Sequence, residues 1–381
     1  MLLAAAGAVS VAVWVYLLAA RGAFWRMREA RPQGVLPAMA PSVVAVVPAR
    51  NEAETVGRAV ASLAAQQYPG AFHIVLVDDA STDGTADAAC AAASPAVLTV
   101  IRGRPLPPGW SGKLWAVDQG VREAARFSPD YLLLTDADIE HPPGNLAALA
   151  ARAESGSIDL VSYMATLRCR AFAERALVPA FVFFFFMLYP PAWVADPRRA
   201  TAGAAGGCML VKRAALECIG GIEAIRGELI DDCALARAVK AGGGRVWLGL
   251  SAATRSLRGY AGLSEIGRMI SRTAFTQLRY QAAVLAGTAA GLAVAYLLPP
   301  ALALASRGGA ARWLGVAAWA MMAAAWLPTL RFYRRSPLWA PFLPLVAAFY
   351  LGATLHSAVS YWRGRGGMWK GRAQAMGRKG S

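Results

Sequence analysis

The stretch Tyr-Leu-Leu-Leu-Thr-Asp-Ala-Asp at residues 131–138 decides the fold. Four apolar residues followed by an Asp-x-Asp triplet are typical of a buried strand that ends in two carboxylates. Open α/β sheets bind ligands at the carboxyl ends of their strands, so Asp136 and Asp138 are predicted to lie at a binding site. Two adjacent carboxylates repel each other unless a cation or hydrogen-bond donors offset the charge, and a divalent Mg²⁺ or Mn²⁺ carrying a diphosphate suits these oxygen ligands. Taken alone, the triplet is equally consistent with a solvated turn.

Short β-rich runs alternate with helical stretches from Ser42 onward. Strands are predicted at 43–47, 74–77, 97–101 and 131–134, with a helix at 55–67 between the first two. This alternation predicts an α/β fold with a Rossmann-like, mostly parallel sheet and crossover helices. Polar residues follow several of these strands, and the carboxyl ends of parallel strands meet at one edge, so we expect a single site there.

The composition indicates a soluble domain joined to membrane helices. The chain is 57% hydrophobic and 16% charged, with a mean hydropathy of +0.40. Its net charge of +16 could suggest nucleic acid. Much of the excess flanks apolar runs, however, as in cytoplasmic anchors that face anionic lipid, so no nucleic-acid partner is expected. The five cysteines are scattered and lack a Cys-x-x-Cys pair, which favours free thiols in a reducing compartment.

The predicted organisation has membrane helices at both ends. Residues 1–20 form an N-terminal anchor rather than a cleaved signal peptide, because the positive charges follow the apolar core. A basic linker, a cytoplasmic catalytic domain, about three membrane helices and a basic tail follow at 21–41, 42–280, 281–362 and 363–381.

The membrane topology stays open at two places. The candidate C-terminal spans are 282–305, 313–330 and 338–361. Three crossings would put the basic tail outside, against the positive-inside tendency, so 338–361 is a candidate for a re-entrant segment. The apolar run 176–194 is also long enough to span, but a crossing there would separate Asp138 from Asp232. We expect an interfacial helix that lines an acceptor site; a hairpin or internal packing are the alternatives.

Six motifs occur in an order that identifies a family resemblance. They are Val-Pro-Ala-Arg-Asn-Glu (47–52), Val-Asp-Asp-Ala-Ser-Thr-Asp-Gly-Thr (77–85), Gly-Lys (112–113), Asp-Ala-Asp (136–138), Gly-Gly-Cys-Met-Leu-Val-Lys-Arg (206–213) and Asp-Asp-Cys-Ala-Leu (231–235). In this order they resemble the family 2 inverting glycosyltransferases with a GT-A fold, over about residues 43–280. The N-terminal anchor, the stretch 272–280 and the basic tail resemble more narrowly the hopene-associated membrane glycosyltransferases of bacteria.

The resemblance implies a site for a nucleoside-diphosphate sugar. The residues that match donor-binding positions are Pro48, Arg50, Glu52, Asp79, Lys113, Asp136, Gly207, Asp231 and Arg272. Among these, Glu52 and Asp79 match nucleoside-binding positions and Lys113 a phosphate-side lysine. Asp138 would hold the divalent metal, Mg²⁺ or Mn²⁺, on the diphosphate. For the stretch 78–85, which contains Asp79, the simpler interpretation is an ordinary turn at Gly84. For Arg272 the simpler interpretation is a lipid-headgroup anchor.

Asp232 matches the general base of the family. It would take the proton of an acceptor hydroxyl as that oxygen attacks the anomeric carbon. One base without a second nucleophile implies a single displacement with inversion. The pair Asp231-Asp232 also fits a helix N-terminus, with Leu235 and Val239 on one face, and both readings can hold together.

The predicted function is sugar transfer to a lipid at the bacterial inner membrane by a multi-pass protein with a cytoplasmic catalytic domain. The finer resemblance implies a hopanoid or polyisoprenoid acceptor. Processive relatives carry Gln-x-x-Arg-Trp near residues 277–280, and that motif is not intact here, which favours a single transfer. A processive polysaccharide synthase and a catalytically inactive membrane scaffold are the alternatives.

Overall fold

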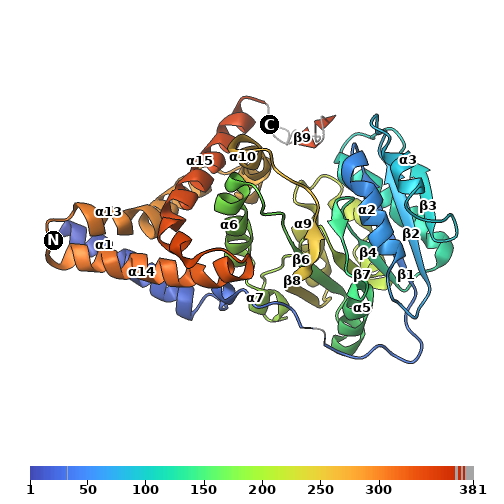
Figure 1. The fold of residues 1–381 in the computed structure, drawn as a ribbon, viewed down its shortest axis with the longest axis horizontal. Helices are drawn as coiled ribbons and strands as arrows, with labels where there is room; N and C mark the ends of the chain where they lie inside the picture. The colour runs from blue at the N-terminus through green and yellow to red at the C-terminus, as the bar shows by residue number, and fades with distance from the viewer. Residues whose placement is uncertain (32, 365–367, 370–371, 374–381) are drawn as a thin grey trace. The chain divides into compact units, whose positions relative to one another are not determined.

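The computed structural model describes residues 1–31, 33–364, 368–369 and 372–373 (Figure 1). The chain divides into two compact units. The helical unit comprises Met1–Met27, Cys169–Ala192 and Gly259–Gly366, and the sheet unit comprises Arg28–Arg168, Trp193–Arg258 and Gly367–Ser381. The predicted bounds of the catalytic domain, 42–280, stay a prediction.

An eight-stranded mixed sheet forms the centre of the sheet unit. The strand order is β3-β2-β1-β4-β7-β6-β8-β5. The strands are β1 (Val43–Ala49), β2 (Phe72–Asp78), β3 (Leu98–Arg102), β4 (Tyr131–Leu134), β5 (Ile139–Glu140), β6 (Leu160–Thr166), β7 (Met209–Lys212) and β8 (Val246–Ser256). The first four run parallel, while β7 is antiparallel to β4 and to β6. The predicted α/β fold with a mostly parallel sheet is confirmed, and all four predicted strands are present.

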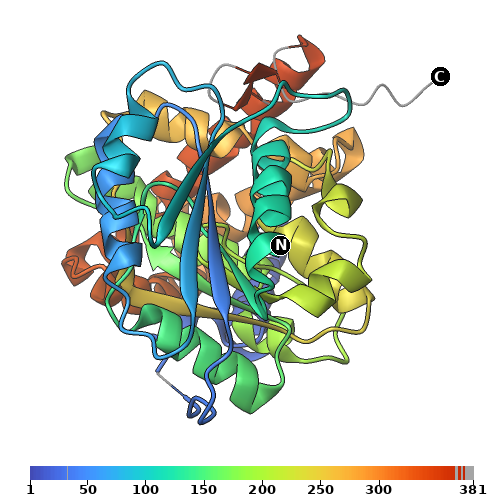
Figure 2. The same cartoon turned by 90° about the vertical axis from the view of Figure 1, so that its right-hand side faces the viewer.

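Helices cover both faces of the parallel strands. The helices of this unit are α2 (Ala53–Ala64), α3 (Thr85–Cys90), α4 (Gly112–Ala124), α5 (Asn145–Gly156), α8 (Arg213–Cys218) and α9 (Asp231–Ala241). Buried Val56, Val60 and Leu63 of α2 pack with alternate residues of β1 and β2. On the opposite face α4 approaches β1 so closely that its Gly120 leaves no room for a side chain beside Val46. Figure 2 shows α2 and α4 on either side of the strands.

Five helical segments of the described residues are long and apolar enough to cross a membrane. They are Leu2–Ala19, Phe172–Ala195, Ala282–Ala305, Gly309–Phe332 and Pro337–Trp362. Their helices are α1 (Leu2–Ala19), α6 (Phe172–Leu188), α7 (Pro191–Ala195), α12 (Ala282–Leu292), α13 (Leu298–Ala305), α14 (Gly309–Phe332) and α15 (Leu343–Trp362), with the shorter α10 (Leu263–Ser271) and α11 (Ala274–Gln277) before α12.

The aromatic helix α6 packs inside the helical unit. Phe183 lies edge-on to Trp326 of α14, with ring centroids 5.1 Å apart, and Phe184 contacts Tyr350 of α15 at 4.9 Å. Tyr350 also donates a hydrogen bond to the carbonyl of Leu177. Internal packing was one of the alternatives for this segment, and its predicted place in the membrane interface stays a prediction.

Candidate functional site

Three loops meet at the carboxyl ends of β1, β2 and β4. Because these strands are parallel neighbours in register, Ala49 of β1 pairs with Asp78 of β2, and Val46 of β1 pairs with Leu134 of β4. The polar residues that follow each strand therefore collect at one edge of the sheet, as the sequence predicted.

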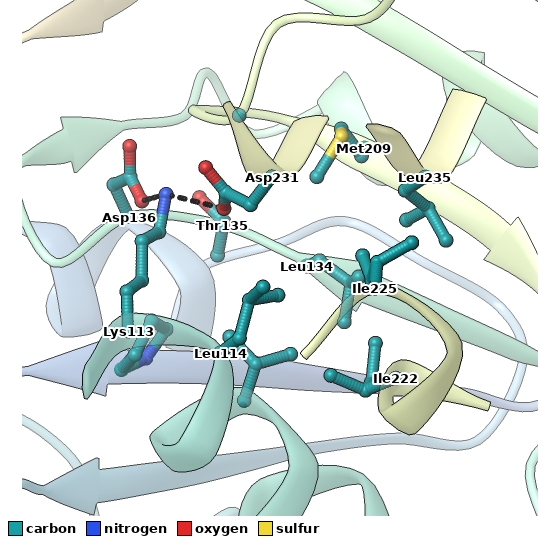
Figure 3. Close-up of a pocket in the computed structure, with 13 residues that line it drawn as sticks. Lys113, Leu114, Leu134, Thr135, Asp136, Met209, Ile222, Ile225, Asp231 and Leu235 are labelled. Atoms are coloured by element: carbon teal, nitrogen blue, oxygen red, sulfur yellow. Dashed lines mark ion pairs between the residues drawn. The ribbon is translucent and has the colours of Figure 1, made fainter. Parts of the chain in front are cut away.

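Lys113 joins two acidic segments that are distant in the sequence. It is the second residue of α4, whose N-cap Ser111 accepts a hydrogen bond from the Leu114 amide. Its Nζ lies 2.8 Å from Oδ1 of Asp136 and 3.0 Å from Oδ2 of Asp231 (Figure 3). Burial alone would lower the pKa of Lys113, but the carboxylates of Asp136 and Asp231 together raise it above its ordinary value. The lysine is therefore charged and bridges the end of β4 to the start of α9.

Asp232 lies beside this bridge at the N-terminus of α9. Its Oδ2 accepts a hydrogen bond from the Gly206 amide at 2.9 Å. Burial raises the pKa of Asp232 to about 6, and the neighbouring Asp231 adds to the rise, while Lys113 and the hydrogen-bonded amides of Cys233 and Gly206 oppose it. A carboxyl group with this pKa is mostly ionised at neutral pH and accepts a proton more readily than an exposed aspartate.

A pocket opens in front of these charged groups. Its polar wall includes Lys113, Thr135, Asp136 and Asp231, as Figure 3 shows. The remaining lining residues are Pro48, Leu114, Val117, Leu134, Gly206, Met209, Ile222, Ile225 and Leu235. Pro48, a predicted donor-binding residue, thus lies at the same pocket as the bridge.

Asp138 lies in an acidic, buried environment. Burial raises its pKa to about 6, followed by repulsion from Asp136 and Glu52, while Arg258 and a hydrogen bond from Ser256 lower it. The Ser256 hydroxyl donates to Oδ2 of Asp138 at 3.2 Å. A cation at this place would relieve the repulsion among the carboxylates.

The donor atoms suit an open metal site rather than a closed one. In the described part of the chain no three His, Cys, Asp or Glu side chains group closely enough to hold an ion by themselves. Mg²⁺ and similar hard cations commonly take one or two carboxylates and complete their shell with water and substrate phosphate oxygens. The carboxylates after β4 therefore fit a metal that arrives with a diphosphate.

The predicted nucleoside-binding residues are held by a second set of contacts. Nη1 of Arg50 lies 3.6 Å from Oδ2 of Asp79 and donates to the backbone carbonyls of Asp79 and Ala80. The Glu52 amide donates to Oγ1 of Thr85 at 2.8 Å. Gly84, at φ +85°, turns the chain into α3. The Asp78–Thr85 stretch is thus a turn, and this turn carries Asp79 to the loop after β1.

Two predicted residues lie differently from the rest. A Cβ on Gly207 would point at Ile139, 3.0 Å from its Cδ1, whereas one on Gly206 would lie 3.3 Å from Nζ of Lys113. Gly206 is therefore the glycine of this pair that faces the charged groups. Arg272 belongs to the helical unit, at the C-terminal cap of α10, so its predicted role toward the diphosphate stays a prediction.

Sequence reasoning missed four polar residues around the Asp-x-Asp loop: Thr135, His141, Ser256 and Arg258. His141 is a lone histidine without metal-ligand spacing. Ser256 is the last residue of β8 and Arg258 follows it, and the sequence analysis did not predict this strand. The position of Ser256 at the end of a strand is the signal that could have found it, once β8 was recognised.

Comparisons with known proteins agree with this geometry. Residues 44–220 match the model of glycosyl transferase family 2. This segment therefore resembles a family 2 glycosyltransferase domain. This match and the GT-A fold support the prediction of a nucleotide-sugar glycosyltransferase.

One solved structure of low sequence identity shares the fold, and a second shows a weaker similarity. The mannosyltransferase PcManGT from Pyrobaculum calidifontis, in complex with GDP-Man and Mn²⁺, is 20% identical, with a TM-score of 0.58 over 94% of this chain and 99% of that chain. Glucosyl-3-phosphoglycerate synthase from Mycobacterium tuberculosis is 21% identical, with a TM-score of 0.41 over 63% of this chain and 79% of that chain. A search of curated protein sequences found no significant match.

Proposed function

We propose that this glycosyltransferase moves a single sugar, with inversion, from a nucleoside diphosphate to a lipid hydroxyl at the cytoplasmic face of a bacterial inner membrane. The observation that carries the proposal is the convergence of two acidic segments on Lys113. Asp136 of the Asp-x-Asp loop pairs with Lys113 from one side, and Asp231, the neighbour of Asp232, pairs with it from the other. This places groups suited to a metal-bound diphosphate close to a buried carboxylate suited to act as a base.

The donor half of the proposed site holds the leaving group. Asp79, which forms an ion pair with Arg50, accepts hydrogen bonds from the nucleoside, and so does Glu52. Such acceptors discriminate against nucleoside analogues that lack the donors. Asp138 would hold the divalent metal on the diphosphate, and Asp136 would contact the ribose or a metal-bound water. When bound, that metal stabilises the negative charge that builds on the departing diphosphate. PcManGT, which shares the fold, binds GDP-Man and Mn²⁺, and this supports Mn²⁺ or Mg²⁺ here.

The acceptor half depends on Asp232. The acceptor hydroxyl passes its proton to the Asp232 carboxylate as the oxygen attacks the anomeric carbon, and the bond to the diphosphate breaks. The Gly206 amide fixes Oδ2 of that carboxylate. With one base and no second nucleophile in the proposed assignment, a single displacement inverts the anomeric centre.

The apolar helices support a lipid acceptor. Five segments of the described chain have the length and composition of membrane spans. The resemblance of residues 272–280 and the ends of the chain to hopene-associated enzymes favours a hopanoid or polyisoprenoid-type acceptor. The interrupted Gln-x-x-Arg-Trp motif disfavours a processive polysaccharide synthase. An inactive scaffold would have no need of the Lys113 bridge between two acidic segments.

A product survey tests this proposal directly. Purified protein in detergent is incubated with a panel of nucleotide sugars, Mg²⁺ or Mn²⁺ and a bacterial lipid extract, and new glycolipids are sought by mass spectrometry. We expect a lipid with one added sugar, absent with Asp232→Asn, although this variant should still bind the donor. Polymeric product would support the processive alternative, and neither product nor metal-dependent nucleotide binding would support the scaffold.

A further inference from the structure

A chain of buried polar side chains lies beneath the Asp-x-Asp loop and has no role in the proposed chemistry. Its members are at most 8% exposed: Thr135, His141, Asn145, Ser251 and Thr254. They come from the end of β4, the segment after β5, the start of α5 and strand β8. Polar groups this deeply buried are costly unless each one is paired, so the pattern of their hydrogen bonds is informative.

The hydrogen bonds run in one direction. Oγ1 of Thr254 donates to Oδ1 of Asn145 at 3.0 Å, and Nδ2 of Asn145 lies 3.0 Å from Nδ1 of His141. Nε2 of His141 lies 2.9 Å from Oγ1 of Thr135, whose hydroxyl donates to the carbonyl of Gly207 at 2.7 Å. Because the Thr135 proton is used on Gly207, Nε2 of His141 must be the donor and Nδ1 the acceptor. A neutral histidine in this one tautomer satisfies every link.

Burial keeps His141 in this neutral form. Desolvation lowers its pKa to about 4. Within the part of the chain that the structure describes, the hydrogen-bond partners of the ring are Thr135 and Asn145, and neither is acidic. The imidazole therefore holds a fixed pattern of one donor and one acceptor throughout the neutral range, as a structural connector requires.

The chain of hydrogen bonds touches both halves of the site. Thr135 directly precedes Asp136, and His141 follows Asp138 by three residues, so the two residues enclose the Asp-x-Asp loop. The Thr135 hydroxyl donates to the Gly207 carbonyl, and the neighbouring Gly206 amide donates to Oδ2 of Asp232. The Gly206-Gly207 segment is thus tied through the Gly207 carbonyl to the donor side and through the Gly206 amide to the base.

We propose that Thr135 and His141 are positioning residues that set the separation between the donor-side carboxylates and the base Asp232. The inference rests on the proposed function for the roles of those carboxylates, and its structural part stands on the hydrogen bonds alone. The proposed chemistry assigns neither residue to the reacting atoms. They act by holding the Gly206-Gly207 segment against the end of β4, and misplacement of a reacting group by about 1 Å can cost on the order of 100-fold in rate.

The test compares three variants of the full-length protein. Thr135→Val keeps the shape of the side chain but removes the hydroxyl, whereas Thr135→Ser restores it. Thr99→Val is the matched control, because Thr99 also bonds a histidine, His73 at 2.9 Å, but lies on β3 near the amino ends of the strands. The measurements are the transfer rate at saturating donor, the affinity for GDP or UDP with Mn²⁺, and the hydrogen exchange of the amides in 204–208.

For Thr135→Val we expect transfer to fall about 10- to 100-fold, nucleotide affinity to change less than about threefold, and amide exchange at Gly206 to accelerate. Thr135→Ser should recover most of the transfer rate, and Thr99→Val should leave exchange in 204–208 unchanged. Wild-type transfer in Thr135→Val overturns the inference. The inference is also overturned if Thr135→Val loses nucleotide affinity and transfer rate equally and its amides exchange faster throughout the sheet unit. That result indicates general destabilisation.

The exchange measurement separates this inference from the proposed function. If the wild-type protein binds neither nucleotide and transfers no sugar, the proposed function fails. Exchange at Gly206 then still decides the inference: faster exchange in Thr135→Val than in Thr99→Val supports the tie between the two loops, and equal exchange refutes it.

Discussion

The carboxyl group of Asp232 should give sugar transfer a pH dependence that reports directly on the site. Burial raises its pKa to about 6, Asp231 adds to the rise, and the Lys113 ammonium opposes it. A general base acts in its ionised form. For one group with a pKa of about 6, the ionised fraction falls about tenfold between pH 7 and pH 5, so the transfer rate should fall by the same factor.

Lys113→Met should shift this fall in transfer rate, the acid limb of the pH–rate profile, to higher pH. A Cβ on Gly206 would lie 3.3 Å from Nζ of Lys113 and 3.4 Å from Oδ2 of Asp232. The two charged atoms are therefore at most about 7 Å apart, where unit charges at an effective dielectric constant of about 20 attract by about 2 kcal/mol. Losing that attraction raises the pKa of Asp232 by between about one and two units. The limb of Lys113→Met is expected near pH 7 to 8.

Single-turnover rates between pH 5 and pH 9 measure the acid limb of the wild type and that of Lys113→Met. Donor and metal must be saturating, because burial, followed by repulsion from Asp136 and Glu52, also raises the pKa of Asp138 to about 6, so acid should weaken donor binding separately. Arg58→Met is the control, since it removes a cation whose ion pair with Glu140 is exposed. A wild-type rate that stays flat down to pH 5, or an unshifted limb in Lys113→Met, would refute the assignment of Asp232 as the base.

Three further substitutions test the metal site, the glycine beside Asp232 and the packing of α4 on β1. Asp138→Asn should weaken the affinity for GDP or UDP with Mn²⁺ by about tenfold or more in calorimetry, because it removes an anionic ligand; unchanged affinity would remove Asp138 from the metal site. Gly206→Ala should slow transfer about tenfold with little change in thermal unfolding, because its methyl group crowds Lys113 and Asp232. Gly120→Val should lower the free energy of unfolding by about 1–3 kcal/mol, since α4 has no room there against β1; an unchanged melting temperature would contradict this packing.

The parallel half of the fold follows from local sequence signals. Each of the first four strands is a short apolar run, and the helix α2 shows the spacing of Val56, Val60 and Leu63 that buries one face. The sequence analysis predicted that this helix ends at 67, whereas it ends at Ala64. The side chain of Gln66 donates a hydrogen bond to the carbonyl of Pro142, and a helical pattern in the sequence does not reveal such a tertiary contact. The helix start at Asp231-Asp232 was predicted because acidic residues favour an N-terminus.

The ion-pair partners of Lys113 could not be predicted from the sequence. The Lys113 bridge joins residues 113, 136 and 231, and no local pattern states that the first turns of α4 and α9 face each other. The buried role of His141 was missed for a related reason. A lone histidine has no spacing to interpret, and its partners Thr135 and Asn145 become informative when the fold encloses all three.

The antiparallel strand β7 explains why the glycine pair belongs to the site at all. In a fully parallel sheet the segment before a strand lies at the edge opposite to the ligand site. Because β7 runs antiparallel to β4, Met209 pairs with Leu134, and the residues that precede Met209 lie beside those that follow Leu134. Gly206 and Gly207 are thereby placed next to Thr135 and Asp136. The reversal of one strand thus lets the backbone between two distant acidic motifs contact both, which the predicted parallel alternation of strands and helices does not provide.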